Sequence, residues 1–330
     1  MRGAGPRVFV LMARLVTVIP VYNGEQYLGA TLDALAGQTR RADRVIIQDN
    51  CSTDGTHHIV RAFEAEGFEW WLTDEHVGST ENFNNALRHA EDADVLHLLT
   101  ADDLIKPEFY ERMLTPLEAV AGRALVYSAY EVIGPEGALV EGGDLMCPFP
   151  IVPGGEPKVI PQKEFIAAQA DLRTICLPAV LMKTNREPLP VEFHTHFIQC
   201  ADAVFYAELA ADCEAVIEVP AALCQYRRHE HTTTSRNRRE PAAVIADEWQ
   251  AMVTASALLG KTGTGAWLWN FRQRCLLAAR SRVKHTQSAN ETPHYRREIE
   301  HATRAITGPW AGMLGNLAVA LRGVSGHGRR

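Results

Sequence analysis

Two adjacent carboxylates, Asp102 and Asp103, follow an apolar stretch, Val95 to Leu99, that is typical of a buried strand. In open α/β sheets, ligands collect at the carboxyl ends of the strands. Two carboxylates buried there without partners would repel each other, and a divalent cation bridging them to a substrate diphosphate would relieve that repulsion. Taken alone, the segment fits equally well an acidic turn before a helix that Pro107 opens.

Two further polar clusters follow earlier predicted strands. Residues 20–24 end the apolar run 15–21, and residues 49–56 follow the run 45–48. In a parallel sheet these clusters and the acidic pair lie along one edge, so they could line one crevice. Each cluster taken singly is more simply a turn with a helix cap. Their order and spacing together favour a shared site.

Apolar runs alternate with helical patterns through the first 130 residues. This alternation predicts an α/β fold with a mostly parallel, doubly wound sheet. Residues 134–161 are rich in Gly and Pro and predict a long loop or short hairpin, and the chain beyond Pro241 reads as all-helical. Trp70 and Trp71 are expected in the core. The predicted strands are 15–21, 45–48, 70–72, 95–99 and 124–130, and the predicted helices are 25–36, 54–66, 79–89 and 107–120.

The motifs of these clusters resemble those of family 2 glycosyltransferases, which have the GT-A fold. The resemblance covers roughly residues 14–235. Thr100 stands where many members carry an acidic residue, and Ala201 stands where many carry Glu before the catalytic base. The segments that carry the resemblance are Val16–Asn23, Asp49–Thr56, the acidic pair, His76–Ser79 with Asn82–Leu87, Gln199–Phe205 and Gln225–His229.

The resemblance implies a nucleotide-binding crevice and a role for each residue of the site. It places Asp103 as a ligand of Mn²⁺ or Mg²⁺, a cation that would neutralise the leaving diphosphate. His229 could also be a metal ligand, because neutral imidazole is the commonest one in proteins. Asp202 would accept the proton of an acceptor hydroxyl, with inversion at the anomeric carbon. Arg227 and Arg228 begin a basic loop that could contact the diphosphate, and this loop fits equally well a solvated segment before the helical region. The implied nucleotide-binding residues are Pro20, Tyr22, Asn23, Asp49 and Asp102.

The expected donor is a nucleoside-diphosphate sugar, with UDP the commonest choice and GDP or dTDP left open. The acceptor could be a glycan, a lipid-linked sugar or a small metabolite. We expect four segments: an N-terminal extension (1–13), a nucleotide-sugar-binding α/β half (14–133), a half with the acceptor site and catalytic base (134–240), and a C-terminal helical region (241–330). That last region could pack on the α/β domain, form a homodimer or touch a membrane surface.

The bulk composition limits the partners and the compartment. The 330 residues carry a net charge of −7, which argues against general nucleic-acid binding because no basic excess is present to neutralise phosphates. Seven cysteines without a CxxC pair fit reduced thiols. No apolar run reaches the length of a membrane span. We therefore expect a soluble cytoplasmic protein, or one peripheral to the inner face of a membrane.

Two other classes of function compete with glycosyl transfer. A non-catalytic nucleotide-sugar or glycan-binding protein on the same fold would be expected to lack Asp103 or Asp202, and both are present. A nucleotidyltransferase would be expected to carry a Gly-rich, basic segment after the first strand, and residues 22–27 do not provide it. Because fold alone does not separate these classes, the site must decide.

Overall fold

The computed structural model describes residues 13–140, 154–230, 239–287 and 292–325, together with residues 149, 232 and 237. The predicted N-terminal extension lies outside the described residues except for Ala13.

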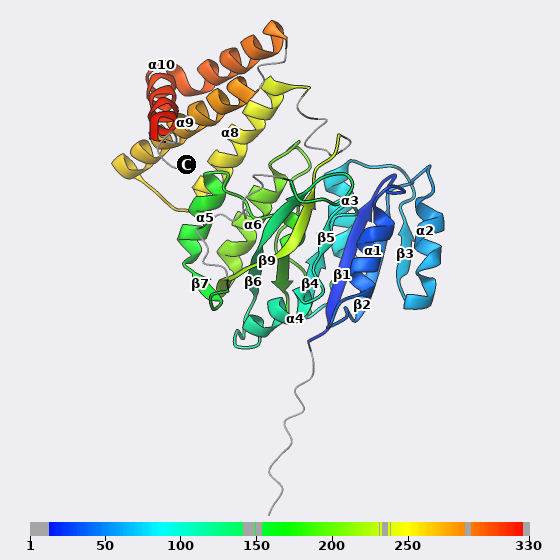
Figure 1. Ribbon diagram of the computed structural model, residues 1–330. Coiled ribbons are helices and arrows are strands. Elements are labelled where there is room, and N and C mark those ends of the chain that lie inside the picture. Colours follow the sequence, from blue (N-terminus) through cyan, green and yellow to red (C-terminus); the bar gives the residue numbers. More distant parts are fainter. Residues whose placement is uncertain are drawn as a thin grey trace, which may run out of the picture.

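Figure 1 shows the arrangement of the elements. The strands are β1 (Leu15–Val21), β2 (Arg44–Asp49), β3 (Glu69–Leu72), β4 (Val95–Leu98), β5 (Leu104–Ile105), β6 (Ala124–Ile133), β7 (Lys158–Ile160), β8 (Val180–Lys183) and β9 (Ala215–Arg227). The helices are α1 (Leu28–Ala36), α2 (Thr56–Ala62), α3 (Ser79–Arg88), α4 (Phe109–Leu114), α5 (Gln162–Ala170), α6 (Ala201–Asp212), α8 (Pro241–Ala257), α9 (Gly263–Gln287) and α10 (Pro293–Ser325), with 3₁₀ turns η1 (Glu64–Glu66), η2 (Thr115–Leu117) and η3 (Leu177–Ala179).

The described strands form one sheet in the order β3-β2-β1-β4-β8-β6-β9-β5, with β7 paired to β9. The α/β fold with a helical C-terminal region is therefore confirmed. The first four strands of this order are parallel, as expected. The second half is mixed, because β8 runs antiparallel to both β4 and β6, whereas β6 and β9 are parallel. Apolar patterning marks a strand without encoding its direction, so the sequence alone could not reveal this half.

Both faces of the sheet are covered by helices. Along β1, Leu15 and Ile19 pack in one core cluster with α1 and α4. Val16 and Val18 point to the opposite face and pack with α3, α5 and α6. This double covering explains the uninterrupted apolar run of β1, since a strand buried on both faces has no reason to alternate with polar residues.

A chain of hydrogen bonds crosses the core between β1, β4 and α4. The Tyr110 hydroxyl lies 2.6 Å from Thr17 Oγ1 and 2.9 Å from His97 Nδ1. The other ring nitrogen of His97, Nε2, lies 2.9 Å from the Pro178 carbonyl, which can only accept, so Nε2 carries a proton and Nδ1 accepts from Tyr110. Burial lowers the pKa of His97 to about 4, which keeps the ring neutral.

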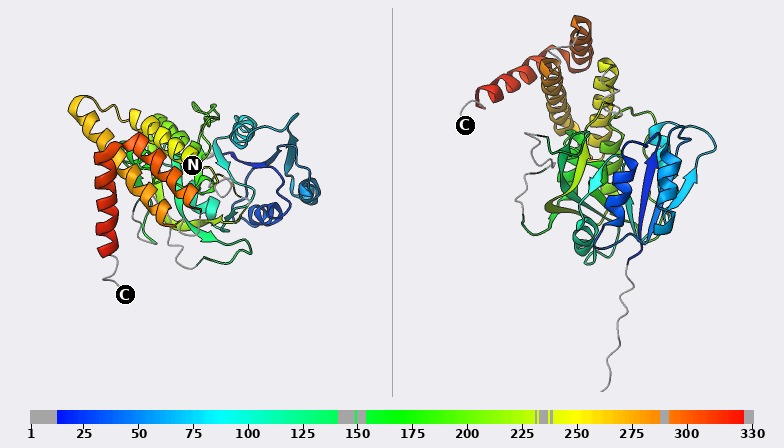
Figure 2. Two further views of the ribbon diagram at one scale, coloured as in Figure 1. Left: turned by 90° about the horizontal axis from the view of Figure 1, so that it is seen from above. Right: turned by 45° about the vertical axis from the view of Figure 1, so that its right-hand side comes forward.

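Helices α8, α9 and α10 form a layer at the end of the sheet away from β3 (Figure 2). Ile245 and Met252 of α8 pack with Val204 of α6 in a third core cluster, so the helical layer is joined to the α/β part through α6.

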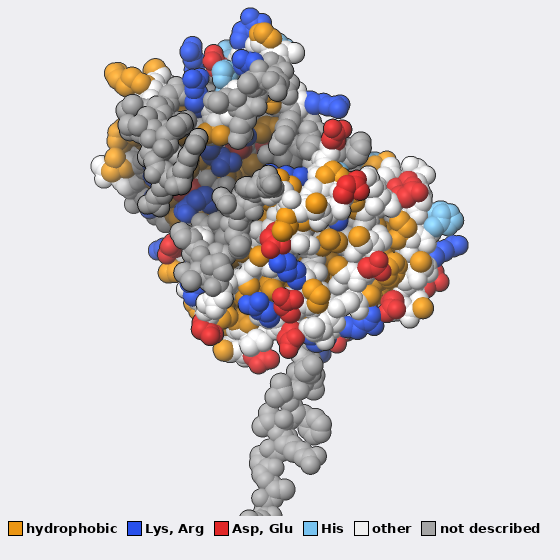
Figure 3. Space-filling model, viewed as in Figure 1, with side chains coloured by type: hydrophobic (Ala, Val, Ile, Leu, Met, Phe, Trp, Pro, Cys, Tyr) orange, Lys and Arg blue, Asp and Glu red, His pale blue; other side chains and the backbone are white. Residues whose placement is uncertain are grey.

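Among the described helices, none combines the length and apolar character needed to cross a membrane. On the face seen in Figure 3, acidic and basic side chains are interspersed.

Candidate functional site

The loops after β1 and β2 are held together by hydrogen bonds. Asn23 has a φ of 51°, in the left-handed region that Asn tolerates better than most residues. Its backbone N–H donates to Ser52 Oγ at 2.9 Å, and its Oδ1 accepts from the Thr53 N–H at 2.8 Å. Gly24 is required because a Cβ there would come within 2.5 Å of Val21. Asn23, predicted as a nucleotide-binding residue, therefore joins the two loops that flank the crevice.

The expected nucleobase pocket gathers at the ends of β1 and β2. Asp49 is buried, and its Oδ1 accepts from the Ser52 N–H at 2.9 Å. Its Oδ2 faces the indole of Trp70, with Nε1 at 3.3 Å. Tyr22 is 44% exposed, and its ring centre lies 4.3 Å from that of His76. Pro20 is buried in β1 directly before these side chains.

The expectation that Trp70 and Trp71 lie in the core is wrong. The two residues are 38% and 42% exposed, because β3 is an edge strand and only its inner side is paired. Trp70 instead adds an aromatic surface beside Asp49.

The sequence did not single out Asn50 and His76 as a pair, although both shape this pocket. Asn50 is buried, and its side-chain amide makes two 2.8 Å hydrogen bonds to the backbone of Val77, one as donor and one as acceptor. His76 Nδ1 lies 3.1 Å from the Asn50 carbonyl oxygen. Asn50 therefore fixes the loop that presents His76 to Tyr22. The His76–Ser79 segment noted in the sequence was the available clue.

Asp102 and His229 meet at the carboxyl end of β4, although 127 residues separate them in the chain. The antiparallel pairing of β5 with β9 joins Leu104 to Gln225 and so brings the end of β9 against the acidic pair. His229 Nε2 lies 3.0 Å from Asp102 Oδ2, and the two side chains are 10% and 30% exposed. One partly exposed carboxylate and one imidazole therefore meet at this strand end.

Asp103 points the other way. It is 1% exposed, and its Oδ1 accepts from the backbone N–H of Arg227 at 2.7 Å. Its Oδ2 accepts from the Thr100 hydroxyl. Burial, together with the negative charge of Asp102, raises the pKa of Asp103 well above its ordinary value. Each of its oxygens accepts one hydrogen bond from the protein, so Asp102 is the more exposed carboxylate of the pair and Asp103 the buried one.

Arg227 is also turned away from the crevice. Its guanidinium donates to the carbonyls of Asp102, Gly134 and Pro135 at 2.8, 3.2 and 2.9 Å. It lies 4.9 Å above the ring of Tyr27, a residue that the sequence did not single out and that also packs against His229. The expected diphosphate contact of Arg227 does not fit these bonds.

The side chain of Arg228, next to the buried Arg227, is exposed. Its exposed guanidinium directly precedes His229 in the sequence, so Arg228 remains a candidate contact for the diphosphate.

Asp202 lies in the first turn of α6 and accepts a hydrogen bond from the Ala203 N–H at 2.8 Å. Burial, with a smaller effect from the charge of Asp247, raises the pKa of Asp202 to about 6. Burial and the neighbouring Cys224 raise the pKa of the Cys176 thiol, and the nearby charges of Asp103 and Asp202 add to this shift. The candidate base therefore lies in the same part of the molecule as the acidic pair.

The helical layer contributes to the position of Asp202. In α8, the carboxylate of Asp247 accepts hydrogen bonds from the backbone N–H groups of Ile198, Gln199 and Cys200, at 2.9, 3.0 and 2.9 Å. These N–H groups directly precede α6, and the N–H groups at the start of a helix have no acceptor within the helix. Asp247 thus anchors the start of the helix that carries Asp202.

The described residues contain no cluster of three or more His, Cys, Asp or Glu side chains suited to a metal ion. The Asp102–His229 pair offers one oxygen and one nitrogen ligand. Mg²⁺ at phosphate-binding sites is commonly held by one or two carboxylates together with substrate oxygens and water, and imidazole suits Mn²⁺ as well. Such a pair therefore fits a cation whose coordination is completed by a diphosphate.

Sequence comparison identifies the first part of the chain. Residues 17–146 match the family model "Glycosyl transferase family 2". Over 103 residues the chain is 34% identical to the putative teichuronic acid biosynthesis glycosyltransferase TuaG of Bacillus subtilis (strain 168). This match covers 30% of the chain and 40% of TuaG, so the chain matches less than half the length of that relative.

The fold is similar to solved structures over most of its length. It matches S. aureus TarS 1–349 in complex with UDP-GlcNAc with a TM-score of 0.64 at 15% identity, covering 91% of this chain and 83% of that one. The match to TarS 1–349 in complex with UDP has a TM-score of 0.54 at 14% identity, covering 89% and 90%. The segment matched by the family model contains the loops after β1, β2 and β4, so this part of the chain is similar to glycosyl transferase family 2, and the chain as a whole has the GT-A fold.

Proposed function

We propose that the protein is an enzyme that transfers a sugar from a nucleoside-diphosphate sugar to an acceptor hydroxyl. The observation that carries this proposal is the contact between Asp102 and His229 at the strand edge where the loops after β1 and β2 also end. A UDP-sugar is the favoured donor because TarS 1–349, which has the same fold, is described with UDP-GlcNAc and with UDP. The exposed ring of Tyr22 and the buried carboxylate of Asp49 provide a face and an acceptor for the base.

Asp102 and His229 would hold Mn²⁺ or Mg²⁺, and the bound cation would neutralise the diphosphate as it leaves. This differs from the sequence-based assignment, which gave the metal to Asp103 and directed Asp102, as a nucleotide-binding residue, at the ribose or the metal shell. Asp103 instead acts as a positioning residue, because its carboxylate holds the backbone of Arg227 just before His229. Arg228 would donate charge-assisted hydrogen bonds to the diphosphate.

Asp202 would act as the general base. With a pKa of about 6, its carboxylate is mostly deprotonated at neutral pH yet basic enough to accept a proton from an attacking hydroxyl. Attack from the side opposite the diphosphate inverts the anomeric carbon and needs no covalent intermediate on the protein.

The identity of the acceptor stays a prediction: a glycan, a lipid-linked sugar or a small metabolite, bound by the half formed by residues 134–240. The homodimer, the peripheral membrane contact of the C-terminal helices and the cytoplasmic location also stay predictions.

Calorimetric titration of UDP with and without Mn²⁺ tests the proposal, with GDP and dTDP as alternative ligands. Asp102→Asn and Asp103→Asn form a matched pair, since each replaces one of two neighbouring carboxyl groups by an amide with little change in volume. We expect Asp102→Asn to weaken Mn²⁺-dependent UDP binding by about tenfold or more, the loss of a charged partner. Asp103→Asn should stay within a few-fold of the parent protein.

If Asp103→Asn weakens Mn²⁺-dependent UDP binding more than Asp102→Asn does, Asp103 rather than Asp102 is the metal ligand. If none of the three nucleotides binds with Mn²⁺ present, the proposed donor class is wrong. Binding of UDP without release of sugar to any acceptor, or to water, would favour the non-catalytic binding protein.

A further inference from the structure

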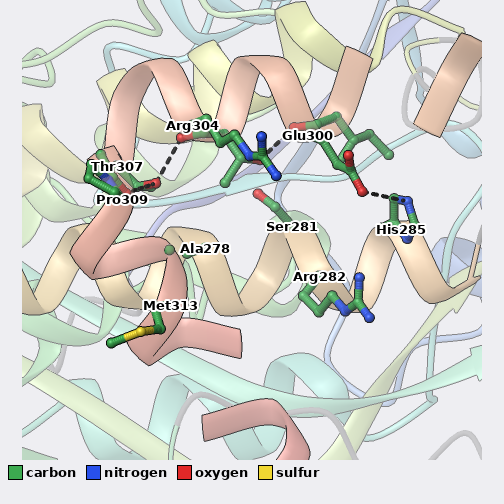
Figure 4. A pocket seen from close by; sticks show the side chains of 13 residues that line it. Ala278, Ser281, Arg282, His285, Glu300, Arg304, Thr307, Pro309 and Met313 are labelled. Atoms are coloured by element: carbon green, nitrogen blue, oxygen red, sulfur yellow. Dashed lines mark hydrogen bonds and ion pairs between the residues drawn. The ribbon is translucent and has the colours of Figure 1, made fainter. Parts of the chain in front are cut away.

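A cavity of about 530 Å³ lies between α9 and α10, apart from the strand edge that carries the candidate active site. Its volume falls in the range of small-molecule pockets. Figure 4 shows that its side chains come from the two facing helices, with Ser281, Arg282 and His285 on α9 and Glu300, Arg304 and Thr307 on α10. The function proposed above does not use this cavity.

Ser281 indicates what the cavity could hold. Its side chain is 2% exposed, it lines the cavity, and its hydroxyl has no hydrogen-bond partner in the described part of the chain. A buried hydroxyl without a partner is costly, so such a group calls for a ligand or water that completes it. The hydroxyl can donate to an anionic oxygen.

Arg304 supplies positive charge across from Ser281. In Figure 4 the guanidinium of Arg304 extends from α10 toward Ser281 on α9. Glu300, one turn earlier on α10, does not neutralise it, because its carboxylate is directed to His285 with Nε2 at 3.4 Å. A hydroxyl donor and a guanidinium converging from two helices are suited to phosphate.

One end of the cavity differs in character. At Gly308, with a φ of 72°, α10 is interrupted, and Pro309 starts its final segment. The backbone N–H groups of that first turn lack helical partners, which adds positive potential there. Ala278 and Met313 line the same end, and Met313 is 56% exposed. A ligand with its anion at Ser281 and Arg304 would therefore place apolar atoms against this end.

We propose that the cavity between α9 and α10 is a binding site for a phosphate ester with an apolar substituent, held at its phosphate by Ser281 and Arg304. Both a phospholipid head group and a soluble phosphate ester carry this chemistry. The site is distinct from the nucleotide crevice and does not depend on the proposed transferase activity.

Calorimetry of the full chain with octyl phosphate below its micellar concentration, and with inorganic phosphate, tests the proposal. Octyl phosphate should bind more tightly than inorganic phosphate. Arg304→Gln should weaken octyl phosphate binding by about tenfold or more, and Ser281→Ala by about three- to tenfold. Arg297→Gln is the matched control, because Arg297 is an exposed arginine of α10 that does not line the cavity, and it should bind like the parent protein.

Absence of octyl phosphate binding at millimolar concentration, or equal binding by the parent protein and Arg304→Gln, overturns the proposal. If inorganic phosphate binds as tightly as octyl phosphate, the proposal that the site also binds an apolar substituent is wrong. Vesicles containing phosphatidic acid distinguish the sources: capture that depends on Arg304 supports a lipid head group, and its absence alongside octyl phosphate binding supports a soluble phosphate ester.

Discussion

Protonation of His97 should destabilise the fold between about pH 6.5 and pH 4. The ring is fully buried, and its pKa falls from 6.5 to about 4. In this interval the unfolded chain binds the proton and the folded chain does not, so the free energy of unfolding falls as the pH falls. A difference of about 2.5 pKa units at 1.36 kcal/mol per unit corresponds to about 3 kcal/mol, present above pH 6.5 and lost toward pH 4.

Urea unfolding followed across this range measures the effect, with His97→Gln removing the titrating group. The difference in free energy of unfolding between parent and variant should shrink by about 3 kcal/mol on going from pH 7 to pH 4. This comparison cancels carboxylates that titrate in both proteins, Asp202 included. His294→Gln is the control, since its 76% exposed side chain should leave the pH dependence unchanged. Parallel pH curves for the parent protein and His97→Gln would refute the reasoning.

Further predictions concern the site itself. Asp202→Asn should retain UDP binding and lower the transfer rate by about 10²–10⁴, because an amide cannot accept the proton of the acceptor. The transfer rate of the parent protein should rise with pH through about 6 and then level off, because the deprotonated form of Asp202 becomes fully populated. A transfer rate that does not change between about pH 5 and pH 8 would remove Asp202 from the mechanism. Arg227→Lys should lower the free energy of unfolding by about 1–3 kcal/mol, since an ammonium cannot reach all three carbonyls of the guanidinium. Denaturant unfolding measures this effect, and an Arg227→Lys variant as stable as the parent protein would contradict it. If Arg228→Lys then weakens UDP binding, Arg228 alone supplies the charge that acts on the nucleotide.

The sequence predicted the first strands closely and the helices less well. The predicted strand 15–21 is β1, and 45–48 lies within β2 (Arg44–Asp49). The predicted helix 107–120 is shorter: α4 ends at Leu114, and the chain continues as the 3₁₀ turn η2. Pro116 explains this, because proline lacks the N–H that an α-helix interior requires. Continuous apolar runs are strong local signals, whereas helix ends depend on single residues.

The residue types of the site were predictable and their orientation was not. Asp49, Asp102, Asp103 and His229 were all identified from local motifs. Which carboxylate faces the crevice depends on β5 pairing with β9, a contact between residues about 120 apart in the chain that no local pattern encodes. The same pairing directs Arg227 inward. Tyr27, which contacts both Arg227 and His229, belongs to no recognisable motif and could be found only in three dimensions.

The acidic pair itself shows why two identical neighbours can take different roles. Asp102 and Asp103 lie at the turn that follows β4 and lead directly into β5. One side of that segment is the protein interior, where Asp103 receives two hydrogen bonds from the protein. On the other side Asp102 is partly exposed and meets His229. Substituting Asp103 therefore acts on the site only through Arg227 and the chain that leads to His229, whereas substituting Asp102 removes a group that would touch the cation itself.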